Sequence, residues 1–434
     1  MSAIKSVHGR RVWDSRGQPT VEVEVALDNG STGRAIAPAG ASRGTREAVD
    51  LRDGGKAMRG KNVENALNSV NGAIAKALIG MPVEDQQSID EKILSLDSSP
   101  LKEVLGGNAT VATSLATLHA AAADAKQPLW QHVANQYDCT PTLPLPEIQI
   151  FGGGAHAGRR VDIQDFMIMV PGAATFDEAL EVTQEVYFAA GDIMAAKGKR
   201  AGVADEGGWW PLFDSNEEAL ETLVKAIEMT GEKPGDRVVI SLDIAASEFR
   251  SNGKYRLALE DRDMDSSALI DMLGNWLDAY PIVSIEDPVG EDDREGMIEF
   301  TRRFGQRVQI IGDDYLVTNA SLVQEAEKDK ACNAVLIKVN QAGTISESIA
   351  TFRAANTAQY ASVVSARSGE TEDISISHLS TGLGCGQLKV GSFQRSERMA
   401  KWNECLRIGE ALGSKSFVAG APLRNTWWHR QIAK

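Results

Sequence analysis

The sequence predicts an α/β protein with an N-terminal α+β domain followed by a parallel α/β barrel. Residues 21–27 alternate valine or leucine with other side chains and precede the turn sequence Asp28-Asn29-Gly30, as in an antiparallel hairpin. Residues 141–146 contain three prolines, which stop helices and central strands. Beyond them, apolar runs alternate with amphipathic segments. We therefore predict domains at residues 1–139 and 140–434.

The N-terminal domain is predicted from a change of hydrophobic period. Residues 4–38 have the alternation of an antiparallel meander of three strands. Residues 38–44 form a loop of glycine and small residues, suited to closing over a ligand. From residue 62 to about 136 the period becomes helical, with breaks near Gly80 and at Gly106-Gly107. This part should therefore be a small sheet covered by helices.

The second domain is predicted from repeated strand and helix patterns. Apolar runs at 238–242, 282–285, 308–311 and 335–337 read as strands buried on both faces, and residues 266–279 and 343–357 read as amphipathic helices. Such repeats build either an open doubly wound sheet or a closed barrel. No GxGxxG motif follows a first strand, which argues against a dinucleotide-binding sheet. We prefer the barrel.

Composition and charge narrow the kind of partner. The 434 residues carry a formal net charge of -15, which argues against nucleic acid as a partner but allows a small anion in a local basic pocket. The four cysteines are widely spaced without a CxxC pair, as in a protein of a reducing cytoplasm. No stretch approaches 18 apolar residues and no secretion signal is recognisable, so we expect neither a membrane partner nor export.

Charged or polar residues end the predicted strands at intervals of about one strand–helix unit each, after a longer first step. In a barrel, the carboxyl ends of the strands meet at one mouth, where enzymes of this architecture keep their chemistry. The spacing therefore gathers three carboxylates, two lysines and an arginine around one pocket, from Asp243, Glu286, Asp313, Lys338, Arg367-Ser368 and Lys389.

Three acidic ligands on rigid strands suit a hard divalent cation, and Mg²⁺ is the usual occupant. Singly, each acid could instead be a solvated strand end or a helix cap. Lys338 ends a buried strand, where a lysine is either paired with an acid or kept neutral for chemistry. Beside a cation its ammonium form is disfavoured, so that it can act as a base. A lysine and a cation together indicate removal of a proton next to a carboxylate.

Two loops offer further candidates with alternatives of their own. Glu206, in the acidic loop 204–208, would serve as the general acid that expels a leaving hydroxyl, or it is a surface acid. His156 follows a run of glycines typical of a mobile loop, although a lone histidine is more often a hydrogen-bonded structural group.

These residues lie in ordered segments that resemble the enolase family over essentially the whole chain. The matching segments are DSRG at 14–17, GAS at 40–42, HAG at 156–158, DEGG at 205–208, SIED at 284–287, GDD at 312–314, LIK at 336–338 and RSGETED at 367–373. The resemblance implies a modified eight-stranded α/β (TIM-type) barrel, usually in a dimer. It also implies a lyase that binds two Mg²⁺ ions in each active site.

The resemblance also assigns roles by position. Asp243, Glu286 and Asp313 would bind the first Mg²⁺, and Ser42 a second one that arrives with the substrate. Lys338 would be the base and Glu206 the acid, with His156 and Asp165 in the same catalytic centre. The remaining expected residues share contact with a small phosphorylated or phosphonylated carboxylic acid, and they are Arg367, Ser368, Lys389, Arg43, Arg159, Gln164 and Ala41.

The chain departs from the family pattern at several of these positions. Asp165 stands where enolases have glutamate, so its carboxylate is retracted by about 1.5 Å. Ala366 replaces a histidine before the RSGE segment, and Phe151 stands near the place of an asparagine. Arg43 replaces a threonine, and Arg159 and Arg160 replace two polar residues. Two closing loops have thus gained guanidinium groups, which grip oxyanions.

Three functions remain open at this point. The departures favour a specialised enolase whose substrate carries another acidic group or a differently placed phosphorus, such as one that makes carboxyphosphonoenolpyruvate in phosphonate biosynthesis. The second is glycolytic phosphopyruvate hydratase, which converts 2-phosphoglycerate to phosphoenolpyruvate. The third is a catalytically dead binding protein, against which the retained Lys338, Glu206 and metal carboxylates weigh.

Overall fold

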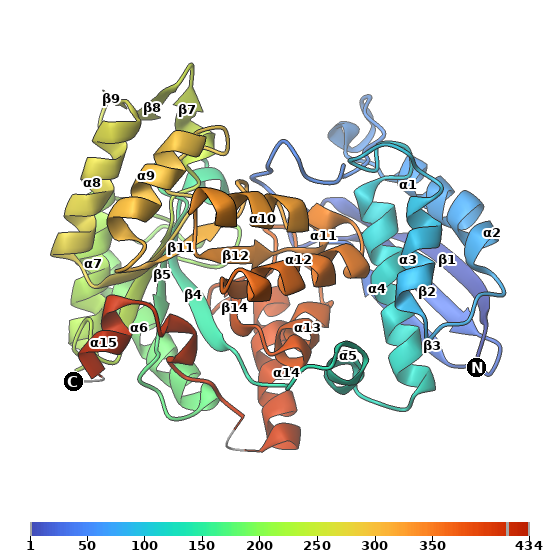
Figure 1. Cartoon of the computed structure of the whole chain (residues 1–434). Helices are drawn as coiled ribbons and strands as arrows, with labels where there is room; N and C mark the ends of the chain where they lie inside the picture. The colour runs from blue at the N-terminus through green and yellow to red at the C-terminus, as the bar shows by residue number, and fades with distance from the viewer. Residues whose placement is uncertain (1, 414–415, 433–434) are drawn as a thin grey trace.

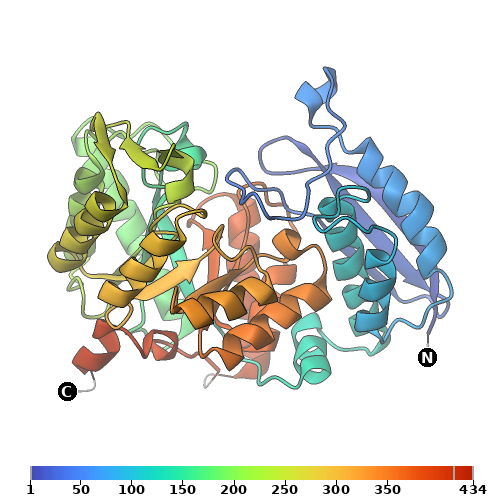
Figure 2. The ribbon, with the colours of Figure 1, turned by 45° about the horizontal axis from the view of Figure 1, so that its top comes forward.

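A computed structural model describes residues 2–413 and 416–432. The chain forms a small α+β domain beside a closed barrel surrounded by helices (Figures 1 and 2). Both features of the predicted fold class are confirmed. Within the described ranges, no helix is long and apolar enough to cross a membrane.

The N-terminal domain is a three-stranded antiparallel sheet with helices on one side. Its strands pair in the order β1-β2-β3, as expected for a meander. Helix α4 packs on the sheet, and Gly33 of β3 allows this because a Cβ there would overlap the backbone of Ala120. The elements are β1 (Ile4–Trp13), β2 (Pro19–Leu27), β3 (Thr32–Ile36), α1 (Glu64–Ser69), α2 (Ala75–Leu78), α3 (Gln86–Leu94), α4 (Gly107–Asp124) and α5 (Leu129–Tyr137).

The barrel contains eight strands in the order β10-β11-β12-β13-β14-β4-β5-β6. All neighbouring pairs are parallel except those of β5, which runs antiparallel to both β4 and β6. The barrel is therefore of the modified kind. The strands are β4 (Leu145–Gly152), β5 (Asp165–Met169), β6 (Val239–Asp243), β10 (Ile282–Glu286), β11 (Gln309–Gly312), β12 (Ala334–Ile337), β13 (Ala361–Ser365) and β14 (Gly386–Gly391).

Helices cover the outside of the barrel, and side chains of the preceding residues cap many of them. Thr175, Ser215, Asp265, Asp293 and Thr344 each accept a hydrogen bond from a backbone N–H of the first turn that follows. The helices are α6 (Phe176–Ala196), α7 (Asn216–Met229), α8 (Ser266–Ala279), α9 (Arg294–Phe304), α10 (Ala320–Asp329), α11 (Val339–Ala342), α12 (Ile345–Thr357), α13 (Ser375–Leu383), α14 (Ser396–Leu412) and α15 (Trp427–Ile432). A small sheet of β7 (Arg250–Ser251), β8 (Lys254–Leu257) and β9 (Arg262–Met264) follows β6.

The two domains share apolar and polar contacts. Val339, Ile345 and Phe352 of the barrel domain pack into the hydrophobic core of the N-terminal domain. The loop after β3 reaches the barrel, where the backbones of Ala39 and Gly369 exchange two hydrogen bonds of 2.9 and 2.8 Å. This contact brings residues 38–48 to the mouth of the barrel, where the strand-end residues lie.

Candidate active site

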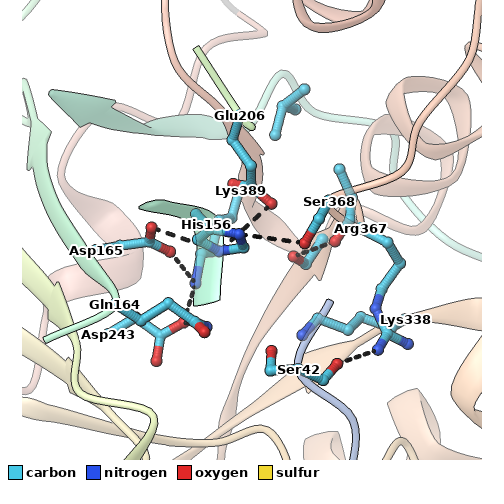
Figure 3. Close-up of a pocket in the computed structure, with 13 residues that line it drawn as sticks. Ser42, His156, Gln164, Asp165, Glu206, Asp243, Lys338, Arg367, Ser368 and Lys389 are labelled. Carbon is cyan, nitrogen blue, oxygen red and sulfur yellow. Dashed lines mark hydrogen bonds and ion pairs between the residues drawn. The ribbon is translucent and has the colours of Figure 1, made fainter. Parts of the chain in front are cut away.

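A small cavity lies at the carboxyl ends of the barrel strands (Figure 3). Most of the predicted site residues line it, and they come from the barrel, from loops 153–165 and 203–209, and from the N-terminal domain. The lining residues are Ser42, His156, Gln164, Asp165, Glu206, Asp243, Lys338, Ser365, Ala366, Arg367, Ser368, Lys389 and Val390.

The barrel topology explains why these residues meet. Asp243 and Glu286 are the last residues of neighbouring parallel strands and lie opposite each other in register. Asp313 and Lys338 directly follow β11 and β12. Asp165 begins its strand, but because β5 is antiparallel its first residue pairs with Asp243 at the same end of the barrel.

Both lysines of the pocket are ion-paired. The Nζ atom of Lys389 lies 2.9 Å from Asp243 Oδ2, 2.8 Å from Glu286 Oε2 and 3.4 Å from Asp165 Oδ2. Lys338 donates a hydrogen bond to Asp313. Burial alone would lower the pKa of Lys338, but the negative charges around it, those of Asp313 and Glu286 foremost, together outweigh burial, and the pKa is raised. Of the two predicted alternatives for this lysine, the ion pair is thus present, and its use as a base stays a prediction.

Asp243, Glu286 and Asp313 are three buried carboxylates whose charges act on one another. The groups whose possible ligand atoms already lie within 4.8 Å of one another are His156, Asp165 and Glu206, and Asp287, Asp313 and Asp314. Glu286 Oε1 is buried and accepts no hydrogen bond. Burial is the main reason why the pKa of Glu286 lies well above its ordinary value. Repulsion from the charges of Asp243 and Asp313 raises it further. A hard cation such as Mg²⁺ would satisfy the free oxygen and offset the repulsion. Ser42 approaches the same cavity from the loop after β3.

A second group of ionisable residues, His156, Asp165 and Glu206, lines the cavity. His156 Nε2 is 3.7 Å from Asp165 Oδ1 and 3.8 Å from Glu206 Oε1, and His156 Nδ1 is 3.3 Å from the Ser368 hydroxyl (Figure 3). Burial raises the pKa of Asp165 to about 6. Burial would also raise the pKa of Glu206, but the nearby cationic groups, His156 and Arg398 first among them, together outweigh burial and the pKa is lowered. Of these two carboxyls, Asp165 therefore holds a proton more readily.

Arg367 is held in place by the N-terminal domain. Its guanidinium donates to both oxygens of Glu47, at 2.9 and 3.2 Å, and to the Ser42 carbonyl at 3.0 Å. Gly40 permits this approach, because a Cβ at that position would overlap the guanidinium. Arg367 is only 3% exposed. The loop that carries Ser42 is thus fastened to the residue expected to bind an anionic group of the substrate.

Three predicted substrate-binding residues lie outside the wall of the cavity. The side chain of Arg43 is half exposed and lies 3.9 Å from Asp50. Arg159 is exposed and donates to the side chain of Glu248 at 2.7 Å and to its carbonyl at 2.9 Å. Ala41 is exposed. Their contact with substrate stays a prediction, and both guanidiniums face an acid of this chain instead of the cavity.

Sequence reasoning missed several residues that shape the site. Besides Glu47, Gln149 hydrogen-bonds Asp165, and the fully buried Arg398 donates to the carbonyls of Arg367 and Ser368 at 2.7 and 2.5 Å. Asp287 accepts the N–H groups of Asp313 and Asp314 at 2.9 and 2.8 Å and so fixes the turn after β11. Only Asp287 had a local signal, because it directly follows a strand-end acid.

Two family models match the chain. The model described as Enolase, N-terminal domain, matches residues 4–133, and the model described as Enolase, C-terminal TIM barrel domain, matches residues 140–426. Together they cover both parts of the structure, including every residue that lines the cavity.

Proposed function

The chain belongs to the enolase family, and from this premise we propose that it is a Mg²⁺-dependent lyase acting on a small phosphorus-containing carboxylic acid. The observation that carries the proposal is that Lys338, Asp165 and Glu206 line one cavity together with Asp243. A base and an acid around a metal site are the parts needed to eliminate water.

The proposed reaction breaks a C–H bond next to the substrate carboxylate and then a C–O bond at the neighbouring carbon. A cation held by Asp313 would disfavour the ammonium form of Lys338. In its neutral form Lys338 takes the proton at Nζ, and the electron pair of the C–H bond becomes the new C=C bond. Glu206 or Asp165 gives a proton to the departing hydroxyl, which leaves as water. Asp243, Glu286 and Asp313 would hold Mg²⁺, with Ser42 toward a second ion. When bound, the metal stabilises the negative charge that develops on the carboxylate.

Cations around the cavity support an acidic substrate of small size. Arg367, Ser368 and Lys389 offer donors to phosphate and carboxylate oxygens. Charged and polar side chains make up most of the cavity wall, which suits a small, highly charged acid. We therefore propose 2-phosphoglycerate or a close phosphate or phosphonate analogue as the substrate.

Ala366 and Asp165 favour the specialised substrate over 2-phosphoglycerate. Both line the cavity, so the missing imidazole and the retracted carboxylate change its wall directly. Arg43 and Arg159 support a specialised substrate less than the sequence suggested. Arg43 faces Asp50 and Arg159 faces Glu248, so neither guanidinium points at the cavity. Ordinary phosphopyruvate hydratase is the second candidate, favoured by the complete set of strand-end groups.

Turnover with defined substrates tests the proposal. The purified protein should bind Mg²⁺ in a calorimetric titration and eliminate water from at least one of two acids, 2-phosphoglycerate or an analogue carrying a phosphonate. Ordinary enolase rates with 2-phosphoglycerate would remove the specialised reading. Metal binding without turnover of either acid would contradict the lyase proposal and favour a binding protein. A homodimer, the other property implied by the family, is testable by light scattering.

A further inference from the structure

Gln149 is a fully buried residue of β4 that connects two parts of the acid side of the cavity. Its side-chain amide donates to Asp165 Oδ1 through Nε2. Its Oε1 accepts the backbone N–H of Gly208 at 2.9 Å. Gly208 lies two residues after Glu206, so one amide group contacts Asp165 directly and Glu206 through its loop.

The backbone around Gln149 leaves room for this amide. A Cβ on Gly208 would overlap Gln149 Oε1, and a Cβ on Gly152 would lie 2.9 Å from the same atom. Only glycine at these two positions lets the loop and the strand approach the amide so closely. The contact therefore depends on three residues, Gln149, Gly152 and Gly208.

The two hydrogen bonds fix different aspects of the acid pair. With Oδ1 of Asp165 held by Gln149, Oδ2 lies 3.4 Å from Lys389 at the cavity. The second hydrogen bond, from Gly208 N to Gln149 Oε1, anchors the loop 204–208. The ends of this loop are joined by a hydrogen bond of 2.7 Å from Ala204 N to Gly208 O. Loop closure places Glu206 Oε1 3.8 Å from His156, which also lies 3.7 Å from Asp165.

We propose that Gln149 is a positioning residue of the elimination reaction, whose single amide sets the orientation of Asp165 and the place of the Glu206 loop together. It touches neither the cavity nor the substrate. The proposal rests on the lyase function proposed above for its kinetic consequence. An error of about 1 Å in a catalytic group can cost about a hundredfold in rate, so a shortened amide should act on kcat. KM should change little, because Arg367 and Ser368 are untouched.

A length exchange between the two partners tests this inference. Gln149→Asn withdraws the amide by one methylene and Asp165→Glu advances the carboxylate by one, so the double variant restores the combined reach while each single variant upsets it. We expect kcat to fall at least tenfold in each single variant and the double variant to exceed the product of the two effects by more than threefold. Multiplicative effects, or a Gln149→Asn variant within threefold of wild type, would overturn the proposal.

Gln86→Asn is the matched control, because Gln86 is also a buried amide that donates to a buried aspartate, Asp90, at 3.0 Å, but in the N-terminal domain. It should lower stability and leave kcat within threefold of wild type. If Gln149→Asn does not fold, Gln149→Met replaces it: this side chain has a similar length but no N–H to donate to Asp165, so kcat should fall. An unchanged kcat in Gln149→Met would contradict the role in orienting Asp165.

Hydrogen–deuterium exchange of the 204–209 segment separates this inference from the lyase proposal. Without any substrate, Gln149→Asn should speed exchange of the Gly208 amide at least tenfold. The double variant Gln149→Asn and Asp165→Glu should show the same faster exchange, because it restores the contact with residue 165 but not the one with Gly208. If wild type turns over no substrate, the proposed function fails while faster exchange still supports the bridge. Unchanged protection in Gln149→Asn would overturn the bridge whatever the activity.

Discussion

The pH dependence of stability should report on Asp90, a buried acid that joins the two domains. Its oxygens accept hydrogen bonds from Ser114 Oγ at 2.6 Å, from Gln86 Nε2 at 3.0 Å, and from the N–H and hydroxyl of Ser346 in α12 at 2.9 and 2.6 Å. Burial outweighs these bonds and raises its pKa from 3.8 to about 6. The folded state therefore holds a proton that the unfolded chain has released.

The sign and size of the effect follow from this shift. A raised carboxyl pKa stabilises the fold at low pH, and that contribution is lost as the pH rises through about 6. Taking 3.8 for the unfolded chain and about 6 for the fold, Asp90 contributes about 1.4 kcal/mol more at pH 5 than at pH 7.5. The facing groups are Gln86, Ser114, Ser346 and Tyr137, and none of them titrates in this window.

Asp90→Asn removes this titration, and urea unfolding at pH 5 and pH 7.5 measures it. Other groups contribute to the pH dependence of both proteins, so the change in unfolding free energy between the two pH values is compared between wild type and variant. Wild type should gain about 1.4 kcal/mol more than the variant on going from pH 7.5 to pH 5. Equal changes in the two proteins, or a larger gain in the variant, would refute the reasoning.

Two further predictions concern the substrate side of the cavity. Glu47→Gln should raise the KM for an anionic substrate about tenfold, because Arg367 loses the carboxylate that it binds through two hydrogen bonds. Steady-state kinetics measure this KM. An unchanged KM would mean that the Ser42 carbonyl alone keeps Arg367 in place. Ala366→His should shift preference toward 2-phosphoglycerate, whereas Arg43→Thr, at an exposed position 3.9 Å from Asp50, should change it less than threefold. The ratio of kcat/KM for the two substrates measures this preference. A larger change of the ratio in Arg43→Thr than in Ala366→His would mean that the loop 38–44 determines specificity.

The site residues at strand ends could be predicted from the sequence, because residues that end successive strands of a parallel barrel lie close together at one end of it. Asp243, Glu286, Asp313, Lys338 and Arg367 follow apolar runs at intervals of about one strand–helix unit, with a longer first step, and closure of the barrel gathers them. The same logic could not place Asp165, which stands at the start of a strand. It reaches the site only because β5 runs against its neighbours.

Long-range side-chain pairing was beyond the sequence. Arg159 looked like a substrate ligand, but 89 positions further along the chain Glu248 accepts its guanidinium. Glu47 and Gln149 carry no spacing signal, since tertiary packing brings their partners to them: Arg367 to Glu47, and Asp165 and Gly208 to Gln149. Such contacts depend on how loops settle on the barrel, which no local pattern encodes.

Exchange of the substrate α-proton with solvent tests the central claim, that Lys338 is the base of a lyase site, most directly. Wild type in D₂O with Mg²⁺ should exchange this proton of the acid that it turns over, and Lys338→Ala should abolish exchange while still binding the metal. Lys102→Ala, which removes another buried lysine paired with Glu347 at 2.6 Å, should keep it. Exchange at the wild-type rate in Lys338→Ala would contradict the account.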